Sequence, residues 1–374
     1  MNQNTFKITL RLILVLALVY WFLVSIGLLG VAFKGFGKGF AETLLTTTSN
    51  PFVGLFIGIL ATSLVQSSST TTSILVGVVA SGVISIENAI PIIMGANIGT
   101  TVTNTLVSLA HISRREEFKR AIAGATVHDF FNLICVVIIF PLELLTGFLQ
   151  KTAVFMANLF ESVGGIEFTS PLKAATKPTI NFIKHLFTDF FESSPTLAYS
   201  LILVAAIILM YFTLFGVVKV MKSLVLDKTE TVLNNILTRG GIVGIFAGII
   251  FTVIVQSSSI TTSLLIPMIA AGIITIEFAF PVTLGANIGT TGTAILASLA
   301  TGNIAAITIA FVHFLFNLFG AVFIYPIKIF RMIPIRLAQG LSELAFKKRR
   351  YALMYVTGVF FVLPGLMILI SKLF

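Results

Sequence analysis

Apolar residues form long runs along the chain, and a short polar cluster divides two of these runs. The sequence Gln-Ser-Ser-Ser stands at 66–69 and returns at 256–259, 190 residues later. Each apolar arm beside a cluster is only about 12 to 15 residues long, which is too short to cross a hydrocarbon core of about 30 Å. The pattern therefore predicts two helical hairpins, each entering and leaving the membrane on one side and carrying a polar tip.

Longer apolar runs are predicted to span the membrane. The first, at 8–32, is too long and too apolar for the core of a cleaved signal peptide. The runs at 87–110 and 277–300 each contain Gly-Ala-Asn-Ile-Gly-Thr-Thr. Glycine, asparagine and threonine are poor helix formers, so we expect both helices to be broken there. The predicted spans lie at 8–32, 87–110, 121–148, 197–221, 277–300 and 351–370.

The two halves of the chain are repeats, and the charges of their loops indicate that the repeats are inverted. Residues 114–120 hold four basic side chains, whereas the equivalent segment 301–305 holds no charge. Basic loops stay in the cytoplasm, so these two loops are predicted on opposite sides, and the three predicted spans between them agree. We therefore expect an all-α integral membrane protein with two inverted repeats, each with a re-entrant helical hairpin and a discontinuous spanning helix.

The expected organisation of the chain follows the repeats. Residues 51–148 and 241–327 are transport repeats 1 and 2. Residues 149–240 form a periplasmic linker and a connecting span. Residues 1–50 hold the N-terminal span and an interfacial helix, and residues 328–374 hold a cytoplasmic basic segment and the C-terminal span, which puts the C-terminus outside.

The composition agrees with a multi-pass membrane protein. Hydrophobic residues make up 57% of the 374 residues and charged residues only 10%, compared with about 25% charged residues in soluble domains. The net charge of +10 comes from basic residues crowded into short loops, as at 114–120 and 347–350. It therefore indicates membrane topology rather than nucleic-acid binding. The single cysteine, Cys135, excludes an internal disulfide and is expected to be a small buried hydrophobic residue.

The polar clusters must be paired or line a wet cavity, because hydroxyl and amide groups are costly in hydrocarbon. Facing hairpin tips could surround one small oxyanion with serine hydroxyls and the N–H groups of helix N-termini. The clusters contain no Arg or Lys, so co-bound cations would balance the anion, which favours ion-coupled symport. The amide oxygens of Gln66, Gln256, Asn97 and Asn287 suit Na⁺. The alternative is that the hydroxyls only bond backbone carbonyls or neighbouring helices.

Other polar or small residues in the apolar runs have competing interpretations. Asp129 lies several residues inside a predicted span, where a carboxylate is a functional-site hypothesis by default. His128 and Asn132 are one helical turn apart and are interpreted as an interhelical hydrogen-bond pair, in preference to substrate contacts. Gly54 and Gly58 are interpreted as a site of close helix packing.

Several stretches resemble the type II sodium-dependent phosphate cotransporters. They read VQSSSTTTS at 65–73, GANIGTTVTNT at 95–105 and FKRAIAGATVHDFFN at 118–132, with VQSSS and GANIGTT again in the second half. The resemblance extends over residues 51–148 and 241–325. It implies Na⁺-driven phosphate import, with the two serine-rich turns at the site.

The resemblance also implies roles for individual residues. Ala123, Ala125 and Asp129 match the pattern A-x-A-x-x-x-D of electrogenic members, so Asp129 is expected to bind one additional Na⁺. The expected phosphate ligands are Ser68, Ser69, Ser258, Ser259, Asn97 and Asn287. The expected Na⁺ ligands are Gln66, Gln256, Ser67, Ser257, Thr101, Thr291, Thr105, Asp129 and Asn132.

Two positions depart from the family pattern. Animal members carry Gln and Asp where this chain has His111 and Arg114, and an arginine cannot ligate Na⁺. The large disulfide-bonded outer loop of animal members is also absent from this sequence. A compact core of this kind indicates a multi-pass protein of the bacterial inner membrane.

We therefore expect a Na⁺-coupled inorganic phosphate symporter that is electrogenic and has no enzymatic activity. The sequence contains no nucleophile–base pair, metal-ligand cluster or nucleotide loop. The expected partners are phosphate, co-transported Na⁺ and membrane lipid, without nucleic acid, and a homodimer stays open. The alternatives are a Na⁺ symporter for another small anion, such as a dicarboxylate, and a channel or receptor-like membrane protein.

Overall fold

The computed structural model describes residues 3–163, 171–237, 241–371 and 373, and these residues form helices and short connections without a β-strand. In the first half the helices are α1 (Gln3–Gly35), α2 (Lys38–Thr48), α3 (Pro51–Val65), α4 (Ser68–Ser81), α5 (Ile86–Gly99), α6 (Val102–Leu109), α7 (Arg115–Thr146), α8 (Phe148–Val163) and α9 (Pro171–Phe190). They continue as α10 (Pro195–Leu237), α11 (Gly241–Val255), α12 (Ser258–Ala270), α13 (Ile276–Thr301), α14 (Ile304–Ile324), α15 (Lys328–Lys347), α16 (Arg350–Thr357) and α17 (Leu363–Ile370).

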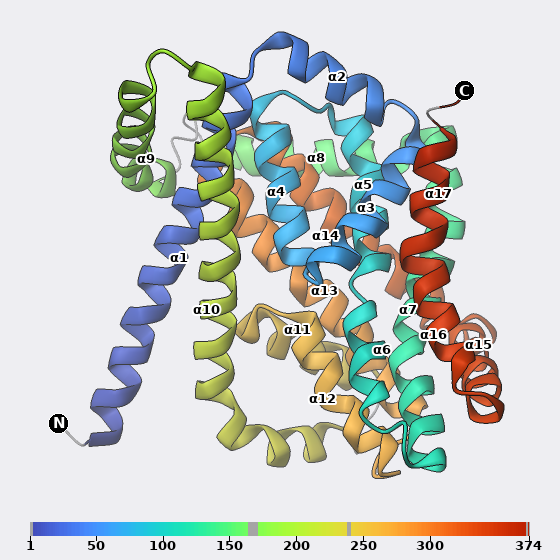
Figure 1. The fold of residues 1–374 in the computed structure, drawn as a ribbon. Helices are drawn as coiled ribbons and strands as arrows, with labels where there is room; N and C mark the ends of the chain where they lie inside the picture. Colours follow the sequence, from blue (N-terminus) through green and yellow to red (C-terminus); the bar gives the residue numbers. More distant parts are fainter. Residues whose placement is uncertain (1–2, 164–170, 238–240, 372, 374) are drawn as a thin grey trace.

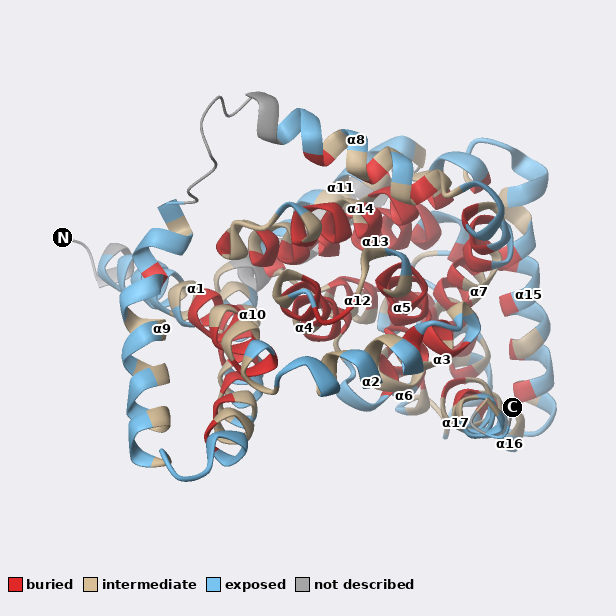
Figure 2. Cartoon of the chain, turned by 90° about the horizontal axis from the view of Figure 1, so that it is seen from above, coloured by how far each residue is buried: buried red, intermediate tan, exposed pale blue. Residues whose placement is uncertain are grey.

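Among the described residues, seven helices are long and apolar enough to cross a membrane, or eight if the bent pair α2–α3 counts as one span. The all-α membrane fold expected from the sequence is therefore confirmed. Buried residues gather at the centre of the molecule, in α4, α5, α13 and α14, whereas α1, α9 and α10 stand together at one side (Figures 1 and 2).

Both predicted hairpins are present as pairs of short helices. They contain 15 and 14 residues in α3 and α4, and 15 and 13 residues in α11 and α12. At 1.5 Å per residue each helix is about 20 Å long, so it ends inside a hydrocarbon core of about 30 Å. In Figure 1, α3 and α4 occupy the upper half and α11 and α12 the lower half, so the two tips meet near the middle.

The same backbone device builds each tip. Gln66 and Gln256 adopt left-handed φ values of 56° and 58°, and they are the only non-glycine residues with positive φ in the described part of the chain. Such a conformation is unusual for a residue with a Cβ. Ser67 and Ser257 follow in extended conformation and cap the next helix. At each of the two tips, a glutamine in a left-handed conformation followed by a capping serine therefore reverses the direction of the chain.

Each hairpin packs backbone against backbone on a following helix, and glycine makes this contact possible. A Cβ on Gly58 would collide with the carbonyl of Ile92 in α5. A Cβ on Gly248 would collide in the same way with the carbonyl of Val282 in α13. The interpretation of the paired glycines as close packing positions is therefore confirmed at Gly58 and its counterpart.

Replacing Gly58 with alanine should destabilise the protein by about 1–3 kcal/mol, because the added methyl group must push α3 and α5 apart. Thermal unfolding of the purified protein in detergent measures this effect. Gly30→Ala on α1 is the matched control, since no neighbouring atom lies within 4 Å of the place that its Cβ would occupy. Equal melting temperatures for Gly58→Ala and Gly30→Ala would contradict the packing argument.

The expected break in the spanning helices occurs in the first half only. Thr100 and Thr101 interrupt the helix between α5 and α6, whereas α13 runs unbroken from Ile276 to Thr301. The prediction of a discontinuous helix is therefore wrong for the second half. The first motif continues as Val-Thr-Asn-Thr and the second as Gly-Thr-Ala-Ile-Leu, so local helix propensity alone does not explain why only the first helix is interrupted.

Three further helices lie in segments expected as linker or basic segment. α8 and α9 occupy much of the 149–195 linker, and α15 occupies most of the basic segment 328–350. Gln150 of α8 donates a hydrogen bond to Glu87 at the start of α5, and Gln339 of α15 donates one to Glu277 at the start of α13. These equivalent pairs extend the likeness of the two halves beyond the hairpins.

Candidate functional site

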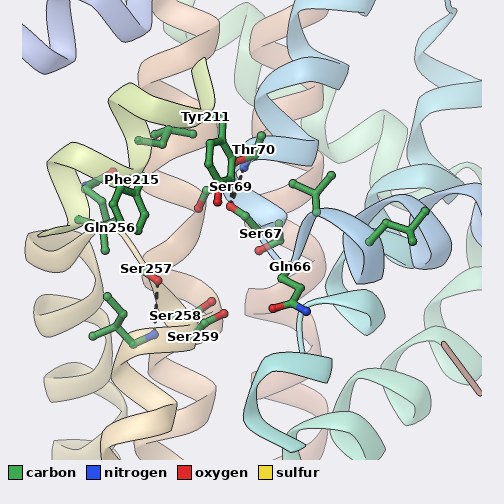
Figure 3. A pocket seen from close by; sticks show the side chains of 16 residues that line it. Gln66, Ser67, Ser69, Thr70, Tyr211, Phe215, Gln256, Ser257, Ser258 and Ser259 are labelled. Atoms are coloured by element: carbon green, nitrogen blue, oxygen red, sulfur yellow. Dashed lines mark hydrogen bonds between the residues drawn. The ribbon is translucent and has the colours of Figure 1, made fainter. Parts of the chain in front are cut away.

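A cavity of about 440 Å³ lies where the two hairpin tips meet. Both copies of Gln-Ser-Ser-Ser line it, so segments far apart in the sequence share one space (Figure 3). The connecting span α10 closes another side with the rings of Tyr211 and Phe215. The lining residues are 64–70, Tyr211, Leu214, Phe215, Val218 and 256–260.

The N-termini of α4 and α12 both meet this cavity. Ser67 Oγ accepts a hydrogen bond from the N–H of Thr70 at 3.2 Å, and Ser257 Oγ accepts one from the N–H of Ile260 at 3.3 Å. The remaining first-turn N–H groups have no acceptor within their own helix. Each N-terminus carries about half a positive charge, and none of the described lining residues is charged. Backbone and hydroxyl dipoles alone therefore make the cavity attractive to an anion.

The serine hydroxyls at the tips differ in their availability. Ser69 Oγ lies 3.3 Å from Thr290 Oγ1, and this contact ties the first tip to α13. The hydroxyls of Ser68, Ser258 and Ser259 line the cavity and bond to no residue in the described part of the chain. Among them, Ser68 and Ser258 are equivalent positions of the two tips, and they form the matched pair of hydroxyls available to donate to a bound anion.

The two glutamines share a backbone conformation but not their side-chain bonds. Gln256 Oε1 accepts a hydrogen bond from Thr293 at 2.8 Å, and its Nε2 donates to the carbonyl of Val253. Gln66 makes no such bond within the described residues, and it lies at the edge of the cavity (Figure 3). Thr103, the equivalent of Thr293, has a buried hydroxyl without a partner among the described residues. The amide of Gln66 is therefore free to bind a ligand.

A network of amide hydrogen bonds joins the two halves in the core. Asn287 accepts from His128 Nε2 and donates to Asn132 Oδ1 at 2.9 Å. Asn132 donates to the carbonyl of Asn97 at 2.7 Å, and Asn317 donates to Asn97 Oδ1 at 3.1 Å. Both amide donors of this network that cross between the halves, Asn287 and Asn317, belong to the second half, and the first half donates to the second through the imidazole of His128. The interpretation of His128 and Asn132 as interhelical hydrogen-bond partners is therefore confirmed.

Asn104 extends this network to the second hairpin. Its Oδ1 accepts a hydrogen bond from Thr262 of α12 at 2.9 Å, and its Nδ2 lies 3.4 Å from His128 Nδ1. A neutral imidazole protonated at Nε2 satisfies both of its contacts. His313, the counterpart of His128, is buried with both ring nitrogens unpartnered among the described residues. The network is therefore complete on one side of the pseudo-symmetry only.

The predicted ligands fall into two groups. The six tip serines and both glutamines line the cavity, whereas Asn97 and Asn287 are held in the buried network and do not line it. Thr101 and Thr291 donate their hydroxyl hydrogens to backbone carbonyls of their own helices. The remaining predicted Na⁺ ligands, Thr105, Asp129 and Asn132, are each 0% exposed. Direct contact of this second group with transported ions stays a prediction.

The structure places the two departures from the family pattern in an ion-paired cluster. Arg114 donates to Glu117 Oε1 at 2.9 Å, and His111 Nδ1 lies 3.2 Å from Glu117 Oε2. His111 and Arg114 are therefore engaged with a carboxylate in the first turn of α7. This pairing agrees with the conclusion that Arg114 holds no Na⁺.

Sequence reasoning missed several residues around the site. Tyr211 and Phe215 stand in an apolar run, where nothing distinguishes a ring facing the cavity from a ring facing lipid. Asn104 lies inside the motif at 95–105, and its position in an apolar helix was the available signal. Thr290, which holds the first tip, belongs to the second copy of the motif.

Comparison with known proteins identifies the family of the chain. The sequence profile described as "Na+/Pi-cotransporter" matches residues 21–166 and 209–370. Sodium-dependent phosphate transport protein 2B of Homo sapiens is 35% identical over 443 residues, which cover 95% of this chain and 64% of the relative. Sodium-dependent phosphate transport protein 2A of Rattus norvegicus is 36% identical over 434 residues, covering 97% and 68%. No solved structure matches the chain. With a profile match over most of its length, this chain belongs to the Na⁺/Pi-cotransporter family.

Proposed function

We propose that this protein is a Na⁺-coupled symporter of inorganic phosphate. The observation that carries the proposal is the single cavity lined by both serine-rich tips. Two helix N-termini and the hydroxyls of Ser68, Ser69, Ser258 and Ser259 supply donors for a small oxyanion. The names of the sodium-dependent phosphate transport proteins to which the chain is similar support phosphate as that anion and sodium as the coupling ion.

Sodium has a defined electrostatic task in this proposal. A divalent phosphate in a cavity lined by uncharged side chains is only partly neutralised by the helix N-termini. Bound Na⁺ ions supply the missing charge, and amide and hydroxyl oxygens are suitable ligands. Gln66, Gln256, Ser67, Ser257, Thr101, Thr291, Thr105, Asp129 and Asn132 are the residues proposed to hold Na⁺, with Asn97 and Asn287 supporting the phosphate.

The proposed transport cycle uses two inverted repeats. The opposite directions of the hairpins in Figure 1 and the crosswise amide bonds support this symmetry. Alternating access follows when one arrangement of the halves opens the tips to one side and the equivalent arrangement opens them to the other. In the described part of this structure, only Gln256 and His128 make side-chain bonds of this kind, to Thr293 and Asn287. In the opposite arrangement we expect these bonds to break and the counterparts Gln66 and His313 to form the equivalent ones.

The location and partners are proposed from composition and topology. The basic segments 114–120 and 328–350 favour the cytoplasm, and the 149–195 segment favours the periplasm. We therefore place the protein in the inner membrane of a bacterium, in contact with lipid and without nucleic acid. A homodimer stays a prediction that a size measurement in detergent can check. The chain spans 64% of the length of the 2B proteins of Pongo abelii and Homo sapiens, so transport by this shorter chain is a proposal.

Uptake of radiolabelled phosphate into proteoliposomes tests the function directly. An inward Na⁺ gradient should accumulate phosphate, whereas an equal gradient of K⁺ or choline should not. Excess arsenate should compete with the label, and excess succinate should not. Accumulation without Na⁺ would overturn symport, and competition by succinate alone would favour the dicarboxylate alternative. Equilibration without accumulation would favour a channel.

A further inference from the structure

Tyr355, a residue of the C-terminal helix α16, places its hydroxyl beside the buried carboxylate of Asp129. The hydroxyls of Tyr355 and Thr101 lie close enough to the carboxylate to act on it as hydrogen-bonding groups. At full hydrogen-bond geometry, however, neither carboxylate oxygen of Asp129 nor the hydroxyl of Tyr355 has a partner among the described residues. Three buried oxygen atoms are therefore left unsatisfied in one place, which is costly unless something binds there.

The hydroxyl of Thr101 cannot satisfy Asp129, because its hydrogen is already used. Thr101 donates to the carbonyl of Ile98 at 2.8 Å, which leaves its oxygen lone pairs available. Thr101 stands in the break between α5 and α6, where the backbone leaves the regular helix. The carboxylate of Asp129 on α7 is therefore approached by the hydroxyl oxygens of Thr101, at the interruption between α5 and α6, and of Tyr355 on α16. Tyr355 has one hydrogen that it can donate, but the lone pairs of both hydroxyls and of the carboxylate outnumber the donors available, and such a set of oxygens fits a cation.

The position of the Tyr355 ring is fixed by its neighbours. Its centroid lies 5.9 Å from that of Phe130, the residue after Asp129, and 5.9 Å from that of Phe360. A π-helical turn at Gly358–Val362 follows directly, and such turns frequently occur at functional sites. The ring therefore points its hydroxyl at α7 without needing a hydrogen bond to hold it there.

The second half of the chain keeps only the counterpart of Thr101, which is Thr291, and lacks the carboxylate, the interruption of the helix and the tyrosine. The offset that relates His128 to His313 puts Phe314 in place of Asp129. The equivalent of the broken helix is the unbroken α13. Tyr355 lies outside both repeats, in the C-terminal span. The site is therefore a single, asymmetric addition to an otherwise paired core.

We propose that the Tyr355 hydroxyl oxygen is a ligand of a monovalent cation bound at Asp129, together with Thr101. One carboxylate and neutral oxygens match a single positive charge, and hydroxyl and carboxylate oxygens suit a hard ion such as Na⁺. This inference rests on the proposed function for the identity of the ion, and it assigns the C-terminal span a part in ion coupling. Tyr355 positions the ion from outside the two repeats.

Tyr355→Phe tests the proposal, because it removes one oxygen and keeps the ring packing. The Na⁺ concentration that gives half-maximal phosphate uptake should rise by about 10-fold, the usual loss for one contact to a charged group. Tyr351→Phe, one helical turn earlier on α16, is the matched control and should leave the Na⁺ dependence unchanged. If Tyr355 acts through the same ion as Asp129, Tyr355→Phe should have no further effect in the Asp129→Gly background.

A binding measurement separates this proposal from the proposed function. Na⁺, compared with choline, should raise the melting temperature of the purified wild-type protein and of Tyr351→Phe, and should raise that of Tyr355→Phe by less at the same Na⁺ concentration. Melting in Na⁺-free buffer shows whether each variant is folded, and Asp129→Asn with Tyr355 intact serves as a second variant whose Na⁺ shift should fall to the part that the other proposed Na⁺ sites contribute. Equal Na⁺ dependence of Tyr355→Phe and wild type in melting would overturn the Tyr355 assignment. Normal Na⁺ shifts without Na⁺-driven uptake would overturn the transport function and leave the cation site in place.

Discussion

Replacing Ser68 and Ser258 together with alanine is expected to reduce Na⁺-driven phosphate uptake by about 100-fold or more at low phosphate concentration. A hydrogen bond to a charged group contributes about 1.5–3 kcal/mol. Two such bonds lost together amount to at least about 3 kcal/mol, and each 1.4 kcal/mol is tenfold in affinity. Initial rates of labelled phosphate uptake in proteoliposomes measure the effect. Each single variant should lose about tenfold.

The structure selects these two serines over their neighbours. Ser67 and Ser257 cap helices, so replacing them costs about 0.5–2 kcal/mol of stability. A loss of uptake could then come from unfolding instead of from weaker phosphate binding. Ser69 is bonded to Thr290. Ser259 has a free hydroxyl in the cavity, but its counterpart Ser69 does not, so Ser68 and Ser258 are the equivalent pair whose hydroxyls are both free and line the cavity.

Two serines farther along the same helices, which do not line the cavity, serve as controls. Ser81 donates to the carbonyl of Val78 in α4, and Ser263 donates to that of Ile260 in α12. Ser81→Ala and Ser263→Ala should therefore leave uptake within about twofold of wild type, since each loses only a bond within its own helix. Uptake by the double variant Ser68→Ala/Ser258→Ala at the level of these controls would show that the tips do not hold the anion.

The meeting of the two tips was predictable because the same polar cluster, Gln-Ser-Ser-Ser, occurs in both halves of the sequence. Polar side chains in apolar helices too short to span have few physical solutions, and a shared cavity is one of them. The left-handed conformation of Gln66 and Gln256 was not predictable, since nothing in a glutamine side chain favours positive φ. It follows from the tertiary packing that brings the helices of each hairpin together.

Other features could not be read from the sequence because they depend on which face of a helix meets which neighbour. Tyr211 and Phe215 line the cavity, yet their run is apolar all round and carries no preferred face. The helix α9 had a readable signal, since Ile180, Ile183 and Phe187 recur at helical spacing and pack towards the core. The polar composition of that segment concealed the pattern.

The same motif lies in an interrupted helix, α5–α6, in the first half and in a continuous helix, α13, in the second half. The motif Gly-Ala-Asn-Ile-Gly-Thr-Thr is the same in both copies, so its own residues cannot decide where the helix breaks. The interruption lies next to Asp129, in the half that has a buried carboxylate. The surroundings of each copy, and not its own residues, therefore determine whether the helix is interrupted.

Asp129→Gly is expected to preserve phosphate uptake but remove its dependence on membrane potential. Asp129 is 0% exposed and does not line the cavity of the serine tips, so the anion site should survive its loss. One net charge moved across 100 mV corresponds to about 2.3 kcal/mol, which is a factor of about 50 in the phosphate gradient that the wild type can build. Without the carboxylate nothing retains the additional cation, so that factor should fall to about one.

Uptake into proteoliposomes with a K⁺ diffusion potential measures this dependence at a fixed Na⁺ gradient. An interior-negative potential should raise accumulation by the wild type and leave accumulation by Asp129→Gly unchanged. Asp189→Gly on α9 is the control, because that carboxylate is 75% exposed and should retain the wild-type response. A full response to potential in Asp129→Gly would mean that the additional cation is bound and carried at another site. The buried carboxylate beside the interruption between α5 and α6 would then have no role in charge transport.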